Sequence, residues 1–587
     1  MRLLEAVAEW ARRTPGAPAL EGPGGERLDY GELARLSDRA AARLRGLGIG
    51  PGGRVGIVLP RSTGLVVTQL AVLKAGACFV PVDPAQPEER IRLLLKAAAP
   101  DLVISEEGAP PAVSGPPAVS GPPAVSPAAL ASGDPGPGER RAAAAAGPQD
   151  VAYCLFTSGS TGFPAGVLIG RAAMDRYVTG YAELAGVGPD DRAGQLGSPG
   201  FDVTIEEIWP FLYAGATVVV APEEERGSPS RLAAWLRGSR ITTAFVPPLL
   251  LEAFFRARPA VDLGAVRLLR TGGERLAAYP PAGAPYRVFN EYGPTETVVA
   301  ATLSEVSAAA DRSGLPPIGR PLPHARTAVR DAAGGPVAAG TPGELYIAGP
   351  TLAIGYLDDE ERTARRFVER DGQRWFRTGD VVRERPDGEL EYLHRLDDQV
   401  QLLGRRVEVG EVERAVAAHP AVRRAAVLAV ADGAGRTDRL VAHVQWTDGQ
   451  DCADPAGLRA ALAASLPAYM VPAGIHTVDR FPVTPAGKID KVALAASAAR
   501  GGESAPDGSP EVSGAVLDSL VRVWEDVLDA DGLGPDADLF DLGGTSLDAV
   551  EIVASVHERL HRPVSVRDVF GHPTPRALAR FLDGETR

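Results

Sequence analysis

The stretch FTSGSTGFPAG occupies residues 156–166, directly after an apolar run that begins at Ala152. Its glycines let the backbone approach an anion closely, and its hydroxyl and amide groups are hydrogen-bond donors. The stretch is therefore typical of a phosphate-binding loop. No lysine follows the glycines, so the loop is not of the GxxxxGK[ST] type, and position 165 is alanine. Taken alone, such a run fits a structural turn equally well.

Length and composition indicate a multidomain globular protein. A chain of 587 residues is too long for one hydrophobic core, and 45% apolar with 23% charged residues is ordinary for a globular protein. No apolar run approaches the length of a membrane span, and the N-terminus MRLLEAVAEWARRTPG lacks the apolar region of a signal peptide. Cys78, Cys154 and Cys452 have no CxxC spacing, which argues against a disulfide framework or zinc site. We therefore expect a cytoplasmic protein without membrane attachment.

The charged residues carry two further indications. The net charge of −14 argues against a nucleic-acid partner, which usually requires a basic face. Of the 61 basic residues only four are lysine, namely Lys74, Lys96, Lys488 and Lys491. In a chain so biased towards arginine, a lysine inside a functional motif indicates a position where arginine does not serve.

The first 395 residues predict a large α/β domain. AEWARRTP (8–15) and GELARLSDRAAARLRGLG (31–48) have the periodicity of amphipathic helices, and RVGIVLP (54–60) that of a buried strand. A proline-rich six-residue repeat at 110–127 predicts an exposed, mobile loop. Strands and helices resume at Val151 and continue to about residue 395.

Two smaller units follow. AAVLAV (425–430) and LVAHVQW (440–446) predict strands of an α+β unit, and residues 499–514 have the composition of a linker. The final segment is helical, with Thr574 and Pro575 as a helix start. Residues 511–587 hold fifteen acidic and seven basic residues, a net charge of 7 − 15 = −8. One helical face collects Leu517, Leu520, Val521, Trp524 and Leu528.

Further motifs accompany the loop in a fixed order. LDYGEL (28–33) and LKAGACFVPVD (73–83) precede it; NEYGPTE (290–296), GELYIAG (343–349), RTGD (377–380), HRLDDQV (394–400), LPAYMVP (466–472) and PAGKIDK (485–491) follow. Together they resemble the adenylation domains of nonribosomal peptide synthetases, within the superfamily of acyl-CoA synthetases and luciferases. DLFDLGGTSLDAV (538–550) resembles the carrier-protein signature around a phosphopantetheinylated serine. The resemblance covers nearly the whole chain and implies an adenylation–carrier didomain.

The resemblance implies a fold in three parts. An α/β large adenylate-forming N-terminal subdomain is expected at 1–396, and a small, mobile α+β C-terminal subdomain at 397–496. A linker at 497–511 then leads to an all-α four-helix carrier domain at 512–584.

The implied reaction is attack of a carboxylate on the α-phosphorus of ATP with release of pyrophosphate, which requires anion donors, a metal and ribose anchors. The resemblance makes Glu296 the Mg²⁺ ligand, Thr295 the donor to the α-phosphate, and Lys488 the bridge between substrate carboxylate and adenylate. It places Arg395 on ribose and phosphate, Tyr292 on adenine, and Asp380 on the ribose hydroxyls. The other expected nucleotide contacts are Thr157, Ser158, Gly159, Ser160, Thr161, Gly162, Gly273, Asn290 and Gly293.

The resemblance also locates an amino-acid pocket. Asp202 matches the acid that pairs with the α-ammonium group of amino-acid substrates, and aryl-acid members lack it. The remaining positions are Val203, Glu206, Phe245, Arg270, Gly272, Glu291, Val299 and Ala300, with Lys488 at the carboxylate. If Arg270 pairs with one glutamate, the other is left for a cationic side chain such as an amine or guanidine. In the alternative, Arg270 faces the substrate and selects a carboxylate or amide.

The carrier and the hinge complete the expected machinery. Asp397 matches the hinge about which the small subdomain turns between two half-reactions. Gly404 matches the path of the pantetheine arm, and Ser546 its attachment site. The cofactors implied are ATP, Mg²⁺ and 4′-phosphopantetheine on Ser546. The expected partners are an amino-acid substrate, a phosphopantetheinyl transferase, an MbtH-like helper protein, and a downstream condensation or tailoring enzyme that docks on the acidic carrier; neither nucleic acid nor membrane is expected.

The match departs from the family pattern at several charges. Ala165 replaces the loop lysine, Gly170, Arg171 and Ala172 replace an acid–histidine–arginine run, and Gln401 and Leu403 replace a lysine and an arginine. A charge-assisted hydrogen bond contributes about 1.5–3 kcal/mol, so we expect a slowed or retuned enzyme. Two other readings stay open: a catalytically impaired scaffold with this fold, and an acyl- or aryl-CoA ligase, which a carrier serine in the same chain disfavours. The start of the adenylation pattern near residue 1 adds the expectation that the product is handed to another protein.

Overall fold

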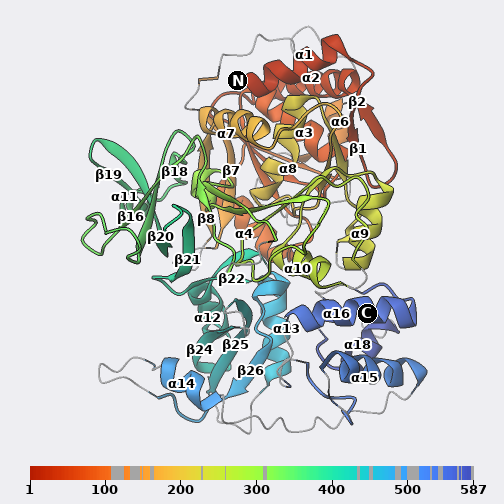
Figure 1. Cartoon of the computed structure of the whole chain (residues 1–587), viewed down its shortest axis with the longest axis vertical. Coiled ribbons are helices and arrows are strands. Elements are labelled where there is room, and N and C mark those ends of the chain that lie inside the picture. Colours follow the sequence, from red (N-terminus) through yellow and green to blue (C-terminus); the bar gives the residue numbers. More distant parts are fainter. Residues whose placement is uncertain are drawn as a thin grey trace, which may run out of the picture.

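A computed structural model represents the chain of 587 residues. It describes residues 1–106, 124–131, 146–147, 150–158, 164–226, 229–257, 260–308, 314–402, 404–431, 436–447, 454–482, 489, 491–498, 514–528, 530, 532–539, 542, 546–564, 568–569 and 572–583. Four β-sheets and a group of C-terminal helices make up this part of the chain (Figure 1).

The largest sheet has nine strands and carries most of the candidate site. Its central strands are parallel, so their carboxyl ends meet at one edge. The spatial order is β15 (Arg320–Pro321), β14 (Thr302–Glu305), β13 (Arg287–Tyr292), β12 (Leu268–Gly272), β11 (Thr243–Phe245), β9 (Arg192–Gln195), β10 (Thr217–Val220), β1 (Pro18–Glu21) and β2 (Arg27–Asp29).

A second sheet has seven strands and carries the loop of residues 156–166. Strands β7 and β8 form an antiparallel pair on either side of that loop. The order is β18 (Gly355–Tyr356), β8 (Ala165–Gly170), β7 (Val151–Thr157), β4 (Cys78–Val82), β3 (Arg54–Val58), β5 (Leu102–Ser105) and β6 (Ala124–Val125).

Helices join these two sheets through one continuous apolar core. Helix α8 (Val203–Ala214) contacts β9, β10 and β11 of the first sheet, and α7 (Arg171–Leu184) contacts β7 and β8 of the second. Because α7 and α8 also pack against each other, they fix the two sheets relative to one another. The other helices of this region are α1 (Arg2–Arg13), α2 (Tyr30–Gly46), α3 (Thr63–Ala75), α4 (Glu88–Ala98), α6 (Pro127–Ala131), α9 (Pro229–Gly238) and α10 (Pro248–Arg256).

Two five-stranded sheets follow in the chain. The third sheet consists of β16 (Arg326–Arg330), β17 (Gly343–Ala348), β20 (Gln373–Glu384), β19 (Phe367–Arg370) and β21 (Leu390–Arg395), with α11 (Glu360–Arg366) beside it. The fourth consists of β23 (Arg405–Glu408), β22 (Gln399–Leu402), β25 (Thr437–Trp446), β24 (Val422–Ala431) and β26 (Gly474–Thr477), with α12 (Val409–Ala417), α13 (Pro455–Ser465) and α14 (Lys491–Ala498). The sheet changes between Arg395 and Gln399, close to the expected boundary at 396; the domain limits themselves stay a prediction.

The C-terminal helices form a core of their own. Helices α15 (Ala515–Leu528), α16 (Ser546–Leu560) and α18 (Pro575–Leu582) enclose Leu520, Trp524, Ile552 and Val553. Through α16 this module contacts α9 and α10 of the large domain, and in Figure 1 it lies below them. Thr574 caps α18, because its hydroxyl accepts a hydrogen bond from the Ala577 amide at 3.1 Å.

Several local expectations are confirmed and others need adjustment. The helix expected at 31–48 is α2 and the strand expected at 54–60 is β3. Asp29 and Glu32 form a reciprocal capping box that starts α2, a feature that was not expected. The first helix begins at Arg2, earlier than the periodicity of residues 8–15 indicated. Residues 124–127 of the proline-rich repeat belong to β6 and the start of α6, and residues 110–123 lie outside the described part. On α15, Val523 is buried and Val521 only half-buried.

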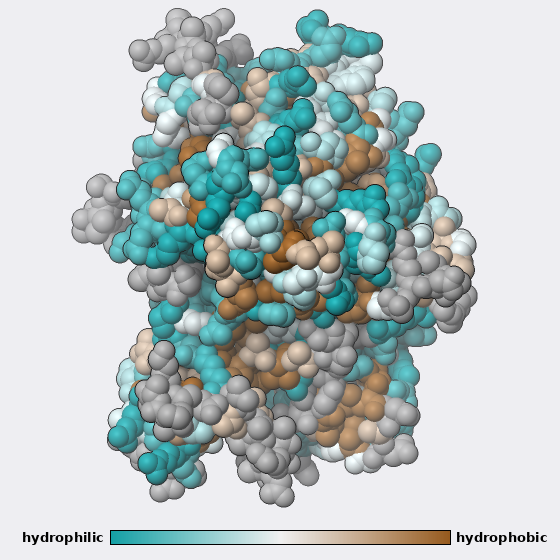
Figure 2. Space-filling model, turned by 60° about the vertical axis from the view of Figure 1, so that its left-hand side comes forward, coloured by the Kyte–Doolittle hydropathy of each residue, from teal (hydrophilic) through white to brown (hydrophobic). Residues whose placement is uncertain are grey.

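One face of the molecule carries both hydrophilic and hydrophobic residues (Figure 2). Figure 2 shows hydrophilic residues over the upper and outer parts of one face and hydrophobic residues gathered near its middle. Within the described part of the chain, no helix is both long enough and apolar enough to cross a membrane.

Candidate active site

The candidate site lies at the carboxyl edge of the nine-stranded sheet. Phe245, Gly272 and Tyr292 are the last residues of the parallel strands β11, β12 and β13. Asp202 and Val203 lie at the N-terminus of α8, which packs beside these strands. Ligand sites of open parallel sheets are found at such carboxyl edges, so the fold gathers the sequence-predicted residues where a substrate can reach them.

Asp202 bonds to another predicted site residue. It occupies the N-cap position of α8, yet its side chain makes no capping hydrogen bond. Its Oδ2 instead accepts the hydroxyl of Thr295 at 2.6 Å. Burial raises the pKa of Asp202 to about 6, the Thr295 hydrogen bond opposes the shift, and nearby Glu296 adds to it. The Thr295 hydroxyl must turn away from Asp202 before it can serve a phosphate.

Glu296 is a fully buried carboxylate held by partners from two other parts of the chain. Its Oε1 accepts the hydroxyl of Tyr356 at 2.6 Å, and Nη1 of Arg406 lies 2.9 Å from Oε2 and 3.1 Å from Oε1. Burial opposes ionisation, but Arg406 and Tyr356 hold the pKa of Glu296 below its ordinary value. A buried, ionised carboxylate requires a cation, and Arg406 supplies it in this structure.

Glu296 also fits the expected role of a magnesium ligand. Mg²⁺ in nucleotide sites is bound by one or two carboxylates together with substrate phosphates. In the described residues no group of three acidic, histidine or cysteine side chains is arranged to hold a metal by itself. A magnesium ion on Glu296 would therefore take the place that Arg406 now fills and would depend on the nucleotide for its other ligands.

The expected ribose and hinge residues form one hydrogen-bonded network. Asp380 accepts Arg395 Nη1 at 2.6 Å on Oδ1 and the Tyr292 hydroxyl at 2.5 Å on Oδ2. Burial raises the pKa of Asp380, and Arg395 opposes the shift. Asp397 accepts Arg395 Nε at 2.7 Å and Arg366 Nη2 at 3.1 Å. Asp397, the expected hinge residue, is thus held by two arginines in this structure.

The phosphate-loop candidate is described only at its ends. Ser158 donates to the carbonyl of Arg406 at 2.9 Å and accepts the Glu408 amide at 3.1 Å, which ties the loop to the fourth sheet. Thr157 donates to the carbonyl of Ala165 at 3.4 Å, and Ala165 is buried in β8. Gly159, Ser160, Thr161, Gly162 and also Lys488 lie outside the described residues.

The other expected nucleotide contacts, Gly273, Gly293 and Asn290, lie close to backbone atoms of neighbouring segments. Gly273 has φ +79°, and a Cβ there would lie 3.2 Å from the carbonyl oxygen of Gly404, so the turn between β22 and β23 approaches the site closely. At Gly293 a Cβ would lie 2.4 Å from the Val299 carbonyl oxygen, which excludes a side chain. The side-chain amide of Asn290 donates a hydrogen bond to the backbone carbonyl of Pro317 at 2.7 Å, so it links two segments of the chain.

The expected specificity residues differ in how far their side chains are buried. Val203, Phe245 and Val299 are half-buried, whereas Glu206 and Arg270 are fully buried and bonded to each other. Gly272, Glu291 and Ala300 are also buried. Val298 and Val299 have φ of +62° and +61°, which is strained for β-branched residues.

Sequence reasoning missed three residues in contact with this machinery. Tyr177 and Tyr181 of α7 donate hydrogen bonds to Glu206 and Glu291, and Arg406 bonds to Glu296. The four-residue spacing of the two tyrosines places them on one helical face, which was an available signal. Nothing in the local sequence indicates their carboxylate partners, because these lie 29 and 110 residues away.

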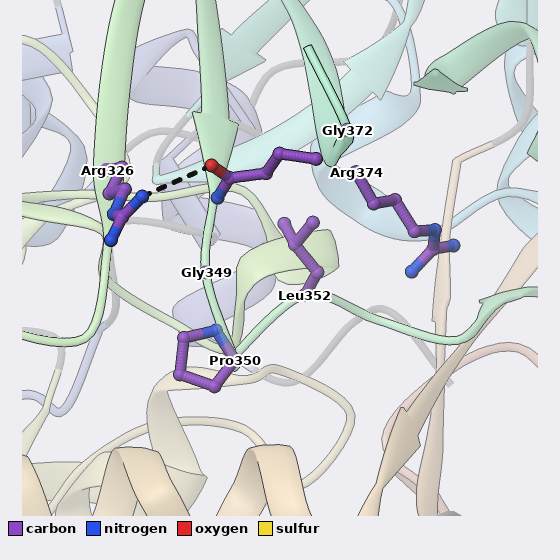
Figure 3. Close-up of a pocket in the computed structure, with 7 residues that line it drawn as sticks. Arg326, Gly349, Pro350, Leu352, Gly372 and Arg374 are labelled. Atoms are coloured by element: carbon purple, nitrogen blue, oxygen red, sulfur yellow. Dashed lines mark hydrogen bonds between the residues drawn. The ribbon is translucent and has the colours of Figure 1, made fainter. Parts of the chain in front are cut away.

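A separate surface pocket of about 480 Å³ lies on the third sheet (Figure 3). It is lined by Arg326, the turn Gly349–Leu352 and the turn of Gly372 and Gln373. Arg326 bonds to Gln373 at 3.3 Å, and Arg374 donates to two backbone carbonyl groups, so both arginines are engaged. None of the predicted site residues lines this pocket.

Comparison with known proteins agrees with this geometry. The family profile described as AMP-binding enzyme matches residues 7–357, its C-terminal domain matches 411–488, and the profile described as phosphopantetheine attachment site matches 518–582. The chain therefore belongs to the AMP-binding enzyme family. An adenylation domain is followed by a carrier domain, which is the order found in nonribosomal peptide synthetases. The adenylation domain is an AMP-forming ligase.

Similar proteins include far longer chains. The chain is 36% identical to the isonitrile lipopeptide synthase of Mycobacterium tuberculosis over 99% of its own length but only 22% of that protein. It is 36% identical to the phosphinothricin tripeptide synthetase PhsC of Streptomyces viridochromogenes over its whole length and 53% of that protein. Holo-PA1221, a solved adenylation–carrier protein bound to a vinylsulfonamide inhibitor, shares its fold with a TM-score of 0.76 at 24% identity, covering 99% of this chain and 96% of that one.

Proposed function

We propose that this chain activates an α-amino acid as its adenylate and loads it onto its own carrier module. One observation carries the proposal: Asp202, the expected partner of an α-ammonium group, lies in the same site as Thr295, Glu296 and the Asp380–Arg395 pair. A cation partner, a phosphate donor, a metal ligand and a ribose anchor are the groups that amino-acid adenylation needs.

In the first half-reaction the chain's own residues bind and orient two substrates. Ionised Asp202 receives the α-ammonium group, which frees Thr295 to donate to the α-phosphate. Asp380 exchanges the Tyr292 hydroxyl for the ribose hydroxyls while Arg395 keeps its charge balanced. A magnesium ion on Glu296 would offset charge on the phosphates. Lys488 would meet the carboxylate that attacks the α-phosphorus.

The second half-reaction uses the orientation of the fourth sheet seen here. Arg406 bonds Glu296, Ser158 bonds the backbone of Arg406 and Glu408, and Gly404 lies against Gly273. In this orientation the turn between β22 and β23 faces the nucleotide site, where the resemblance expects the pantetheine arm to enter. Asp397, clamped by Arg366 and Arg395, is the proposed hinge.

The carrier module supplies the acceptor. Helix α16 begins at Ser546, so a phosphodiester on that serine would lie at the positive end of a helix of 15 residues. The attached phosphopantetheine arm would provide a thiol nucleophile. A phosphopantetheinyl transferase and a downstream condensation or tailoring enzyme are the proposed partners, with an MbtH-like helper, and the proposed location is the cytoplasm.

ATP–pyrophosphate exchange against a panel of amino acids tests the first half of the proposal. We expect exchange that depends on one amino acid and on Mg²⁺. The same assay with aryl acids, which carry no α-ammonium group, should give background rates. Exchange with an aryl acid alone would favour an acyl-CoA ligase-like enzyme, and inactivity with every acid would favour the scaffold.

A further inference from the structure

A buried cluster of charged side chains lies behind the candidate pocket. Glu206 of α8 accepts Arg270 Nη1 at 2.5 Å on Oε1 and the Tyr177 hydroxyl at 2.5 Å on Oε2. Glu206 and Arg270 have no exposed surface, and the guanidinium also lies 5.3 Å from the ring centre of Phe211. Both oxygens of Glu206 therefore have partners, and its charge is neutralised within the protein.

Glu291 differs from Glu206 because one of its carboxylate oxygens accepts no hydrogen bond from a described residue. It lies at the carboxyl end of β13, beside Gly272, and only 5% of it is exposed. Its Oε1 accepts the Tyr181 hydroxyl, whereas no described donor reaches its Oε2. An ionised carboxylate buried with one oxygen lacking a donor is costly, so Glu291 either holds a proton, which favours its contact with Glu206, or requires a ligand that brings a donor.

We propose that Glu291 Oε2 is the acceptor for a positively charged side chain of the substrate amino acid, an amine or a guanidine. This inference rests on the proposed activation of an α-amino acid. The charges support it, because Arg270, Glu206 and ionised Glu291 sum to 1 − 2 = −1, and a substrate cation brings the buried cluster to neutrality. Arg270 donates through Nη1 to Glu206 and lies over the Phe211 ring, whereas no described acceptor reaches its Nε and Nη2. A substrate carboxylate or amide that accepts from these two nitrogens is therefore the alternative that the substrate comparison below tests.

The cluster also implies that a cationic substrate side chain displaces a proton from Glu291 when it binds. Burial and the neighbouring Glu206 raise the pKa of Glu291 well above its ordinary value, and Arg270 and the Tyr181 hydroxyl oppose the shift. Three other titratable groups at the cluster stay neutral, because burial raises the pKa of Tyr177 and Tyr181 and lowers that of His324, which lies edge-on to Tyr177, to about 4. Glu207, whose charge acts on Arg270, has a pKa raised to about 7 by burial and titrates with either substrate. Without substrate, Glu291 therefore holds a proton, and a cation must displace it.

Binding of a cationic side chain should strengthen as the pH rises. Below the raised pKa, binding of a cationic side chain releases one proton, so its apparent affinity rises about tenfold per pH unit until the pKa is reached. A neutral side chain of the same length releases none. Asp202 and the substrate α-ammonium group are common to both substrates and cancel in their ratio.

The first experiment compares matched substrates in ATP–pyrophosphate exchange between pH 6 and 8. L-lysine is paired with L-norleucine, and L-arginine with L-citrulline. We expect the kcat/KM of at least one cationic member to exceed its neutral partner at least tenfold at pH 8, with the ratio falling as the pH is lowered. A neutral or acidic amino acid as the best substrate would overturn the inference and leave amino-acid activation standing, whereas absence of all exchange would defeat the proposed function itself.

Variants locate the effect at Glu291. Glu291→Gln should reduce the cationic-to-neutral ratio at least tenfold and abolish its pH dependence, while Glu305→Gln, an exposed glutamate on neighbouring β14, should change neither. Tyr181→Phe removes a hydrogen bond that favours ionised Glu291, so the midpoint of the ratio should move to higher pH. Equal losses for both substrates in Glu291→Gln, or an unmoved midpoint in Tyr181→Phe, would contradict the assignment.

Discussion

At the scale of single residues, partners decide what each carboxylate can do. Glu296 and Glu291 are buried and Asp202 is half-buried, yet Arg406 keeps the first ionised, Glu206 favours a proton on the second, and Thr295 partly stabilises the charge of the third. Burial alone would raise every one of these pKa values. The three carboxylates therefore differ in charge state, which is consistent with the proposed roles of Glu296 towards a metal, Glu291 towards a side-chain cation and Asp202 towards an α-ammonium group.

The raised pKa of Asp202 predicts an acid limit on amino-acid binding. Because its pKa is about 6, Asp202 loses its charge below that pH and no longer attracts the α-ammonium group. With a substrate whose side chain is neutral, kcat/KM in exchange should fall about tenfold per pH unit below 6.

Asp202→Asn supplies the comparison for this limit. It should lower kcat/KM about ten- to a hundredfold at pH 8, the loss of one charge-assisted hydrogen bond, and remove the break near pH 6. An unchanged pH profile in this variant would show that another group titrates.

At the scale of elements, ion pairs join the fourth sheet and its helices to the large domain. They come from separate elements, so together they fix one orientation of the small unit. The pairs are Arg90–Glu411 at 2.6 Å, Glu252–Arg436 at 2.8 Å and Glu296–Arg406 at 2.9 Å.

Breaking the Glu296–Arg406 pair should separate the two half-reactions. Arg406→Gln removes a charge-assisted bond that holds the orientation proposed for transfer, so transfer to the carrier should slow about ten- to a hundredfold while exchange stays within about threefold. Single-turnover loading and exchange measure the two steps. Arg424→Gln, on β24 of the same unit, is the control, and equal loss in both steps would mean that Arg406 only supports the fold.

Local sequence patterns predicted the helices and strands better than they predicted the contacts between distant residues. The helix α2, the Thr574 cap of α18 and the strand at Arg54–Val58 were predicted from neighbouring residues. The Tyr181–Glu291 bond and the positive φ of Val298 could not be predicted this way, because tertiary packing imposes both. Family motifs located candidate positions such as Asp202 and Glu291, but their partners became visible only in the folded chain.

At the scale of the whole molecule, one chain contains both a candidate activating site and a candidate acceptor. The carrier helices contact α9 and α10, and the start of α16 places Ser546 at a helix N-terminus. Ala165 lies inside β8 with little exposed surface, so the family lysine is replaced by a residue of the sheet's core. In the proposed activation, Arg395, a magnesium ion on Glu296 and backbone donors would therefore meet the phosphates without this lysine.

The most direct test of the account is intact-mass analysis of the chain after treatment with a phosphopantetheinyl transferase, followed by ATP, Mg²⁺ and the best exchange substrate. We predict two successive mass gains, one of the phosphopantetheine arm and one of the aminoacyl group, and neither gain in Ser546→Ala. An arm without a subsequent aminoacyl gain, or either gain in Ser546→Ala, would contradict self-loading at this serine.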